Sequence, residues 1–113
     1  MPVADNTSTD APAEALQEQP PPACVMSFNA SDATGAGGSA GDVATIAAMG
    51  AHALPVVTSI VLRDTAEIFE HSALDAEVVV EQARSVLEDV TISAWKVGFL
   101  GSAEGVSAVA EVL

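Results

Sequence analysis

Basic residues and cysteine are scarce in this chain of 113 residues. Three side chains are basic (Arg63, Arg84 and Lys96) against 16 acidic ones, which gives a net charge of -13. A charge this negative repels nucleic-acid backbones and anionic membrane surfaces, so we expect the protein to bind neither. The single cysteine, Cys24, excludes an internal disulfide and fits a reducing compartment.

Long apolar runs are missing as well. No apolar stretch reaches the roughly 18 residues of a membrane-spanning helix, and the first residues lack the basic and apolar regions of a secretion signal. We therefore expect a cytoplasmic protein. Hydrophobic residues make up 50% of the chain, which is enough for the core of one domain.

The start of the chain differs in composition from the rest. Residues 1–22 contain acidic residues, no basic residue and a run of three prolines, and their apolar residues are mostly alanine. This composition predicts a disordered acidic tail that ends in a short, stiff polyproline segment. The folded domain is expected at residues 23–113.

The pattern of the folded part indicates three strands that alternate with three helices. The strands are expected at 23–28, 54–62 and 92–99, and 54–62 is apolar and β-branched enough to be buried on both faces. Residues 63–73 are expected to be a polar crossover. Alternating strands and helices form parallel, right-handed units, so we predict a Rossmann-like parallel α/β sheet. The last helix carries no stop signal, which predicts a sheet truncated after the third β-α unit.

Capping residues and apolar faces locate the helices more closely. The residues expected to cap turns and helices are Asp32, Ser39 with Asp42, Asp75 or Ser72, and Ser102. The alternative for Asp32 and Asp42 is a pair of polar side chains that bind a ligand. The residues expected on buried helix faces are Val43, Ile46 and Ala47, then Val79, Ala83, Val86 and Leu87, then Val106, Val109, Ala110 and Leu113. Trp95 is expected in the core. His52 and His71 are expected at the surface, because no other metal ligand is suitably spaced from them.

A glycine-rich loop follows the first strand. Residues 35–40 match the dinucleotide-binding pattern G-x-G-x-x-A, and Asp64 could serve as its ribose-binding acid. In that pattern the first glycine directly follows the strand, whereas residues 29–34 intervene here. The loop is therefore either a flexible turn or a place where backbone N–H groups approach a ligand at the carboxyl end of the sheet. No P-loop motif occurs.

Three motifs recur at the spacing found in one known family. They read NASDATGAGGSAGD at 29–42, LRDT at 62–65 and KVGFL at 96–100. They resemble A-G-[ST]-D-[PS]-[ST]-G-G-A-G-x-Q-A-D, V-Q-[ND]-T and K-I-G-M-L of the hydroxymethylpyrimidine/phosphomethylpyrimidine kinases of thiamine biosynthesis. This resemblance covers about residues 23–113 and implies the N-terminal portion of a three-layer, ribokinase-like fold.

The resemblance also implies a substrate-binding role for four residues. Ala30 and Gly37 belong to the segment that would close one side of a pyrimidine pocket, although the family usually has glycine and alanine there. Phe99 stands where a methionine lines the pocket. Arg63 stands where a glutamine reads the edge of the pyrimidine.

The arginine at position 63 changes what this pocket can recognise. Glutamine donates and accepts hydrogen bonds, whereas arginine only donates, so a match to an aminopyrimidine edge would be weakened. Arginine would instead suit a carboxylate or phosphate. The alternative is that Arg63 turns outward and pairs with Asp64 or Glu67.

The resemblance finally implies a kinase that uses ATP and Mg²⁺ to phosphorylate hydroxymethylpyrimidine and its monophosphate. The family's ATP site and catalytic base come from a downstream G-T-G-C segment that these 113 residues lack. We therefore expect no catalytic residue, bound ATP or metal in this chain alone, and no turnover. Two alternatives stay open: a non-catalytic, kinase-derived binding domain and a dinucleotide-binding Rossmann domain. The expected partner is a small pyrimidine, and exposed strand edges also allow a homodimer.

Overall fold

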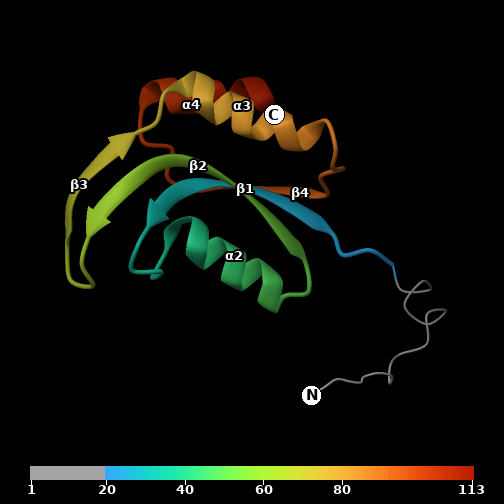
Figure 1. The fold of residues 1–113 in the computed structure, drawn as a ribbon, viewed down its shortest axis with the longest axis horizontal. Helices are drawn as coiled ribbons and strands as arrows, with labels where there is room; N and C mark the ends of the chain where they lie inside the picture. Colours follow the sequence, from blue (N-terminus) through green and yellow to red (C-terminus); the bar gives the residue numbers. More distant parts are fainter. Residues whose placement is uncertain (1–19) are drawn as a thin grey trace, which may run out of the picture.

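The computed structural model describes residues 20–113, so the predicted tail lies almost wholly outside the described residues. The described part forms a four-stranded sheet with helices on both faces (Figure 1). Its elements are β1 (Cys24–Asp32), α2 (Gly38–Ala48), β2 (His52–Arg63), β3 (Ile68–Ala73), α3 (Ala76–Leu87), β4 (Ala94–Val97) and α4 (Ala103–Val112). Among the described residues, no helix is both long and apolar enough to cross a membrane.

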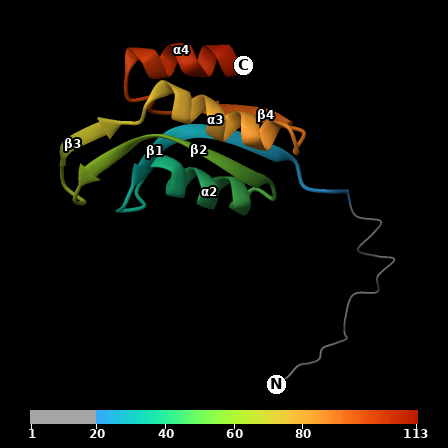
Figure 2. The same cartoon turned by 45° about the horizontal axis from the view of Figure 1, so that its top comes forward.

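The sheet has the strand order β3-β2-β1-β4. β1 is central and pairs in parallel with β2 and with β4, as predicted. Helix α2 covers one face, while α3 and α4 lie side by side on the other (Figures 1 and 2). This is the predicted three-layer α/β arrangement.

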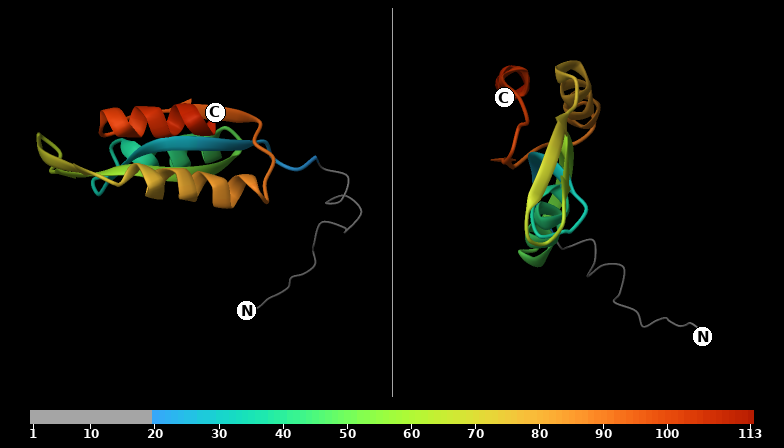
Figure 3. Two further views of the ribbon diagram at one scale, coloured as in Figure 1. Left: turned by 90° about the horizontal axis from the view of Figure 1, so that it is seen from above. Right: turned by 90° about the vertical axis from the view of Figure 1, so that its left-hand side faces the viewer.

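The predicted crossover at 63–73 is wrong in one respect, because it contains β3. This strand runs antiparallel to β2. The Asp64 carboxylate accepts hydrogen bonds from the N–H groups of Ala66 at 2.8 Å and Glu67 at 2.9 Å, which closes a tight turn. The β2–β3 hairpin extends past the ends of the helices (Figure 3), so the sheet is mixed rather than wholly parallel.

The hydrophobic core lies between the sheet and the α3–α4 layer. Met26 and Phe28 of the central strand are fully buried there, and each contributes roughly 1.5–3 kcal/mol by leaving water. The predicted buried face of α3 is confirmed for Val79 and Ala83, and its other two members pack half-buried against the core. Val56 and Val109 complete this cluster of buried side chains.

The predicted faces of the other two helices need correction. No residue of α2 is buried, and Val43 and Ala47 are exposed, because this helix turns Asp42 toward the sheet. In α4 the buried residues are Gly105, Ala108 and Val109. The apolar residues expected with Val109 are exposed instead: Val106, Ala110 and Leu113.

Strand and helix ends also differ from the predictions. β1 runs four residues past the expected end at Phe28, whereas β4 is shorter than the expected 92–99. Gly37 is the N-cap of α2, so Ser39 does not cap it, and Asp75 caps α3 without a side-chain hydrogen bond. The cap of α4 is confirmed: the Ser102 Oγ accepts a hydrogen bond from the Gly105 N–H at 2.9 Å.

Candidate functional site

A cavity of about 420 Å³ opens where β1, β2 and β4 end. Four sequence segments meet there: the end of β1 with the loop that follows it, the end of β2, β3, and the residue pair after β4. All four residues that the sequence singled out line this one cavity. The complete lining is Asn29, Ala30, Asp32, Gly37, Gly38, Val61, Arg63, Ile68, His71 and Phe99.

The glycine-rich loop is a defined turn held by Asp32. One carboxylate oxygen, Oδ1, accepts hydrogen bonds from the Thr34 hydroxyl at 2.8 Å and the Thr34 N–H at 2.9 Å. The other, Oδ2, accepts from the Gly37 N–H at 3.2 Å. The Thr34 hydroxyl, the Thr34 and Gly37 N–H groups and Arg63 lower the pKa of Asp32, although burial opposes them. The predicted capping role of Asp32 is therefore confirmed.

Gly38 allows the loop to close tightly against β1. Its φ of +65° is left-handed, and a Cβ there would lie only 2.4 Å from the Ala30 carbonyl oxygen. Helix α2 begins at this glycine, and its N-cap Gly37 provides no side-chain hydrogen bond. The N–H groups of the first turn of α2 therefore start at the cavity wall without a side-chain cap.

Arg63 lies in the wall of the cavity and points back toward the loop. Its Nη1 is 3.6 Å from the Asp32 Oδ2, and its Nε donates to the Asp64 carbonyl oxygen at 2.9 Å. The arginine side chain is 22% exposed. Its ion-pair partner is thus the Asp32 carboxylate, while its charge also helps to lower the pKa of Asp64, so the predicted pairing with Asp64 is present only in part.

Asn29 fixes the position of Phe99. Its Oδ1 accepts hydrogen bonds from the N–H of Ala30 at 2.9 Å and of Phe99 at 3.0 Å. Gly98 leaves room for this amide, because a Cβ at that position would lie 2.5 Å from it. The Phe99 carbonyl oxygen in turn accepts from the Thr58 hydroxyl at 2.6 Å. The backbone that carries the aromatic ring is therefore held from two strands.

A polar cluster on the α2 side of the sheet supports the same strand ends. The Asp42 carboxylate accepts hydrogen bonds from the Ser27 hydroxyl at 2.5 Å and the Asn29 amide at 3.0 Å, and it lies 2.9 Å from the Lys96 Nζ. Burial raises the pKa of Asp42, but the bonds from Ser27, Lys96 and Asn29 outweigh this effect and lower the pKa overall. Asp42 therefore ties α2 to β1 and β4, and the predicted capping role is wrong.

The sequence reasoning missed the contribution of β3 to this site. His71 pairs with Val61 across the hairpin, and its ring meets the Phe99 ring edge to face at 5.1 Å between centroids. His71 is exposed, as predicted, but it lines the cavity together with Ile68. The signal that could have revealed both was the apolar pair Ile68-Phe69 directly after the Asp64 turn.

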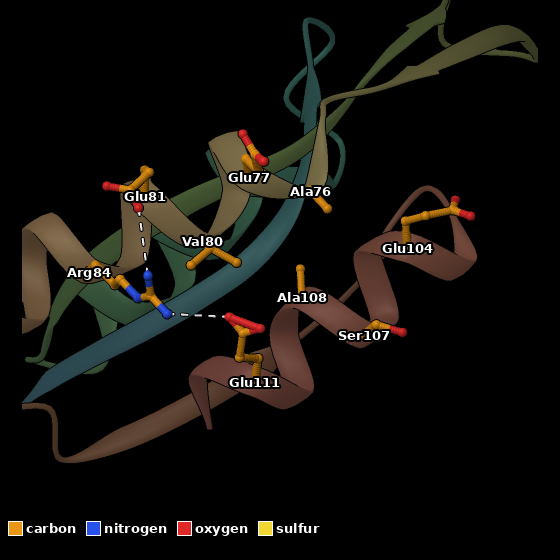
Figure 4. A pocket seen from close by; sticks show the side chains of 9 residues that line it. All are labelled: Ala76, Glu77, Val80, Glu81, Arg84, Glu104, Ser107, Ala108 and Glu111. Carbon is orange, nitrogen blue, oxygen red and sulfur yellow. Dashed lines mark hydrogen bonds and ion pairs between the residues drawn. The ribbon is translucent and has the colours of Figure 1, made fainter.

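A second hollow, of about 680 Å³, lies between α3 and α4 (Figure 4). Arg84 is its only basic residue, 3.7 Å from a Glu81 oxygen and 3.2 Å from a Glu111 oxygen. These side chains are mostly exposed, and ion pairs between exposed side chains contribute little to the stability of the fold. Its lining is Ala76, Glu77, Val80, Glu81, Arg84, Glu104, Ser107, Ala108 and Glu111, which includes none of the predicted site residues.

Grouped metal ligands and free basic side chains are scarce among the described residues. Among residues 20–113, no group of three His, Cys, Asp or Glu side chains could hold a metal ion. Of the three basic side chains, Lys96 is bound to Asp42 and Arg84 lies in the α3–α4 hollow, so only Arg63 is near the cavity.

Comparisons with known proteins agree with the motifs. The sequence model of the family described as phosphomethylpyrimidine kinase matches residues 32–113. A hydroxymethylpyrimidine/phosphomethylpyrimidine kinase of Streptomyces coelicolor is 36% identical over 92 residues, which are 81% of this chain and 34% of that protein. Its counterpart from Mycobacterium leprae is 33% identical over 96 residues, with the same coverage.

A solved structure gives the same result for the fold. The crystal structure of a phosphomethylpyrimidine kinase from Clostridium difficile 630 superimposes with a TM-score of 0.76 at 27% identity. The match covers 80% of this chain and 39% of that one, so this chain spans about a third of the length of the curated kinases it matches. On the family match, the shared fold and the three motifs, this chain belongs to the phosphomethylpyrimidine kinase family.

Proposed function

We propose that the cavity at the carboxyl ends of β1, β2 and β4 is the substrate-binding part of a hydroxymethylpyrimidine/phosphomethylpyrimidine kinase. The observation that carries this proposal is that Ala30, Gly37, Arg63 and Phe99, from three separate segments, line one cavity. Its volume of about 420 Å³ suits a small heterocycle. Ligands of open α/β sheets bind at this edge of the sheet. The family match leaves the dinucleotide alternative without support.

Different walls of the cavity can contact different parts of a pyrimidine ligand. Phe99 with His71, and Val61 with Ile68, provide surfaces that a flat ring can contact. The uncapped first turn of α2, next to Gly37, can donate N–H groups to a hydroxymethyl or phosphate oxygen. Arg63 is the one charged donor in the lining, and its guanidinium already forms an ion pair with the Asp32 carboxylate.

Replacing Arg63 with glutamine is expected to increase the affinity for hydroxymethylpyrimidine at least tenfold, or about 1.4 kcal/mol. Glutamine restores an acceptor beside a donor at the ring edge. Asp32 keeps its bonds from Thr34 and Gly37, so the loop should hold its shape. Isothermal titration calorimetry measures the effect, and Arg84→Gln in the α3–α4 hollow is the matched control. An unchanged or weaker affinity of Arg63→Gln would argue against a pyrimidine edge at this position.

We also propose that these 113 residues alone do not catalyse phosphoryl transfer. The complete enzyme would use ATP and Mg²⁺, but among residues 20–113 no three His, Cys, Asp or Glu side chains are grouped for a metal ion, and Arg63 is the one basic side chain in the cavity lining. An assay with ATP, Mg²⁺ and hydroxymethylpyrimidine is expected to show no phosphorylated product above background. Product formation that scales with the concentration of the purified chain would contradict this expectation.

A non-catalytic domain that binds an anionic ligand is the second candidate function. The observation in its favour is the donor-only Arg63 in the cavity wall. The nearby Asp32 carboxylate works against it, because its charge offsets that of the guanidinium. Titration with a phosphorylated and an unphosphorylated form of the same pyrimidine separates the two candidates, since only the anion-binding domain would require the phosphate.

A further inference from the structure

His71 is the polar side chain of the cavity lining that has no hydrogen-bond partner within residues 20–113. The other polar side chains of the lining are already engaged. Asn29 accepts hydrogen bonds from two backbone N–H groups and donates one to a carboxylate of α2. Both oxygens of Asp32 accept hydrogen bonds from the glycine-rich loop, and Arg63 pairs with Asp32. A ligand in the cavity therefore meets an imidazole whose ring nitrogens are available to it.

The β2–β3 hairpin brings His71 and Arg63 to the same wall of the cavity. His71 pairs with Val61, which lies two positions before Arg63 on β2. Side chains two positions apart on a strand share a face, and all three of these residues line the cavity. The Phe99 ring orients the imidazole through an edge-to-face contact, with 5.1 Å between centroids and 87° between planes. An acceptor nitrogen thus lies on the wall that also carries the guanidinium.

We propose that His71 is a specificity-determining residue, which accepts a hydrogen bond from the amino group of the pyrimidine while Arg63 donates one to the adjacent ring nitrogen. An aminopyrimidine edge presents a donor beside an acceptor, and arginine can match only the acceptor. A neutral imidazole has one nitrogen that accepts, so the two side chains together match the whole edge. This inference rests on the proposed function of the cavity as a pyrimidine site.

The two side chains together are a weaker match than a single glutamine. The guanidinium already forms an ion pair with Asp32, and His71 is exposed to water, which competes for its nitrogens. The expected gain from Arg63→Gln therefore still holds when His71 takes part in binding. The two residues should also depend on each other, because glutamine at position 63 would supply an acceptor of its own.

A purely apolar role for His71 is the alternative, in which its ring only packs against Phe99. Phenylalanine could take over that role without loss. His71→Phe is instead expected to weaken the binding of hydroxymethylpyrimidine to the 113-residue chain about tenfold, as measured by isothermal titration calorimetry. His71→Gln, which restores an acceptor, should bind within about threefold of the parent. Equal affinity of His71→Phe and the parent would overturn the inference.

Two controls show whether the lost affinity belongs to the amino group. His52→Phe changes an exposed histidine at the opposite end of β2 and should leave the affinity unchanged. A pyrimidine with hydrogen in place of the amino group should bind equally to the parent and to His71→Phe. A loss of about tenfold for this second ligand as well would overturn the inference, because His71 would then contact some other part of the ring.

A double-variant cycle separates recognition from a general effect on the hairpin. In a chain that carries Arg63→Gln, the further change His71→Phe should weaken binding by less than about threefold, because glutamine supplies the acceptor. An equal loss with arginine and with glutamine at position 63 would overturn the inference. Absence of pyrimidine binding by the parent and by every variant would instead contradict the proposed function, and this inference with it.

Discussion

Replacing Gly38 with alanine is expected to destabilise the protein by about 3 kcal/mol or more and to abolish ligand binding at the cavity. A left-handed backbone costs a residue with a Cβ roughly 1–2 kcal/mol. The added methyl would also lie 2.4 Å from the Ala30 carbonyl oxygen, and such overpacking typically costs about 1–3 kcal/mol. The loop would have to move away from β1, which opens the cavity wall at Gly37. Urea unfolding followed by circular dichroism measures the first effect.

The same loop provides the control for this prediction. Gly35 also has a left-handed backbone, with φ of +74°, but a Cβ there would meet no atom within 4 Å. Gly35→Ala should therefore cost only the backbone part, about 1 kcal/mol, and leave the cavity intact. Equal losses for the two alanine variants would show that close packing against Ala30 does not hold the loop.

Removing the Asp42 carboxylate is expected to destabilise the protein by about 3 kcal/mol. Asp42→Ala leaves the Ser27 hydroxyl and the Asn29 amide, both buried, without their acceptor, and it leaves Lys96 without its partner. The matched control is Glu111→Ala, which breaks an ion pair with Arg84 whose two side chains are mostly exposed. That variant should change the free energy of unfolding by less than about 1 kcal/mol.

The pH dependence of Asp42→Ala follows from the direction of the pKa shift. The folded protein lowers the pKa of Asp42, so its contribution is complete above the unfolded carboxyl pKa of about 3.9 and falls as pH drops through the folded value. The gap in unfolding free energy between parent and variant should thus be constant near neutral pH and shrink below about pH 4. Asp32 and Asp64 also have lowered pKa values, but both residues are present in the parent and in Asp42→Ala, so their effects cancel in the difference. A gap that widens in acid would contradict this account.

The sequence predicted those parts of the fold in which local pattern and tertiary packing agree. The parallel pairing on β1, the buried face of α3 and the Ser102 cap each rest on a strong local signal, and each is present. β3 was missed because Glu67 and Glu70 make its segment look like a polar loop. Its strand conformation depends on pairing with β2 and on the Asp64 turn.

The candidate site was predicted from the resemblance to the kinase family, and only in part. The resemblance implied Ala30, Gly37, Arg63 and Phe99, and all four line the cavity at the carboxyl edge of the sheet. The hydrogen bonds of Asn29 and Asp42 could not be foreseen. They join β1 to residues 13 and 70 positions away in the sequence, and no local pattern reports such contacts.

The predicted apolar face of α4 shows a different limit of sequence-based prediction. The sequence predicted Val106, Ala110 and Leu113 as buried, and the described residues leave them exposed. The apolar residues of a helix indicate which of its sides can be buried. Which of these sides is buried depends on the elements that pack against the helix. The predicted buried face of α4 is therefore confirmed only at Val109.

The central claim is that this cavity binds the pyrimidine substrate, and a nuclear magnetic resonance titration tests it most directly. Hydroxymethylpyrimidine would be added to the ¹⁵N-labelled chain up to millimolar concentration. The account predicts shifts of the backbone amides of Gly37, Gly38 and Phe99 at the cavity, with Glu81 and Ser107 in the α3–α4 hollow unchanged. No shifts at all, or shifts confined to that hollow, would contradict it.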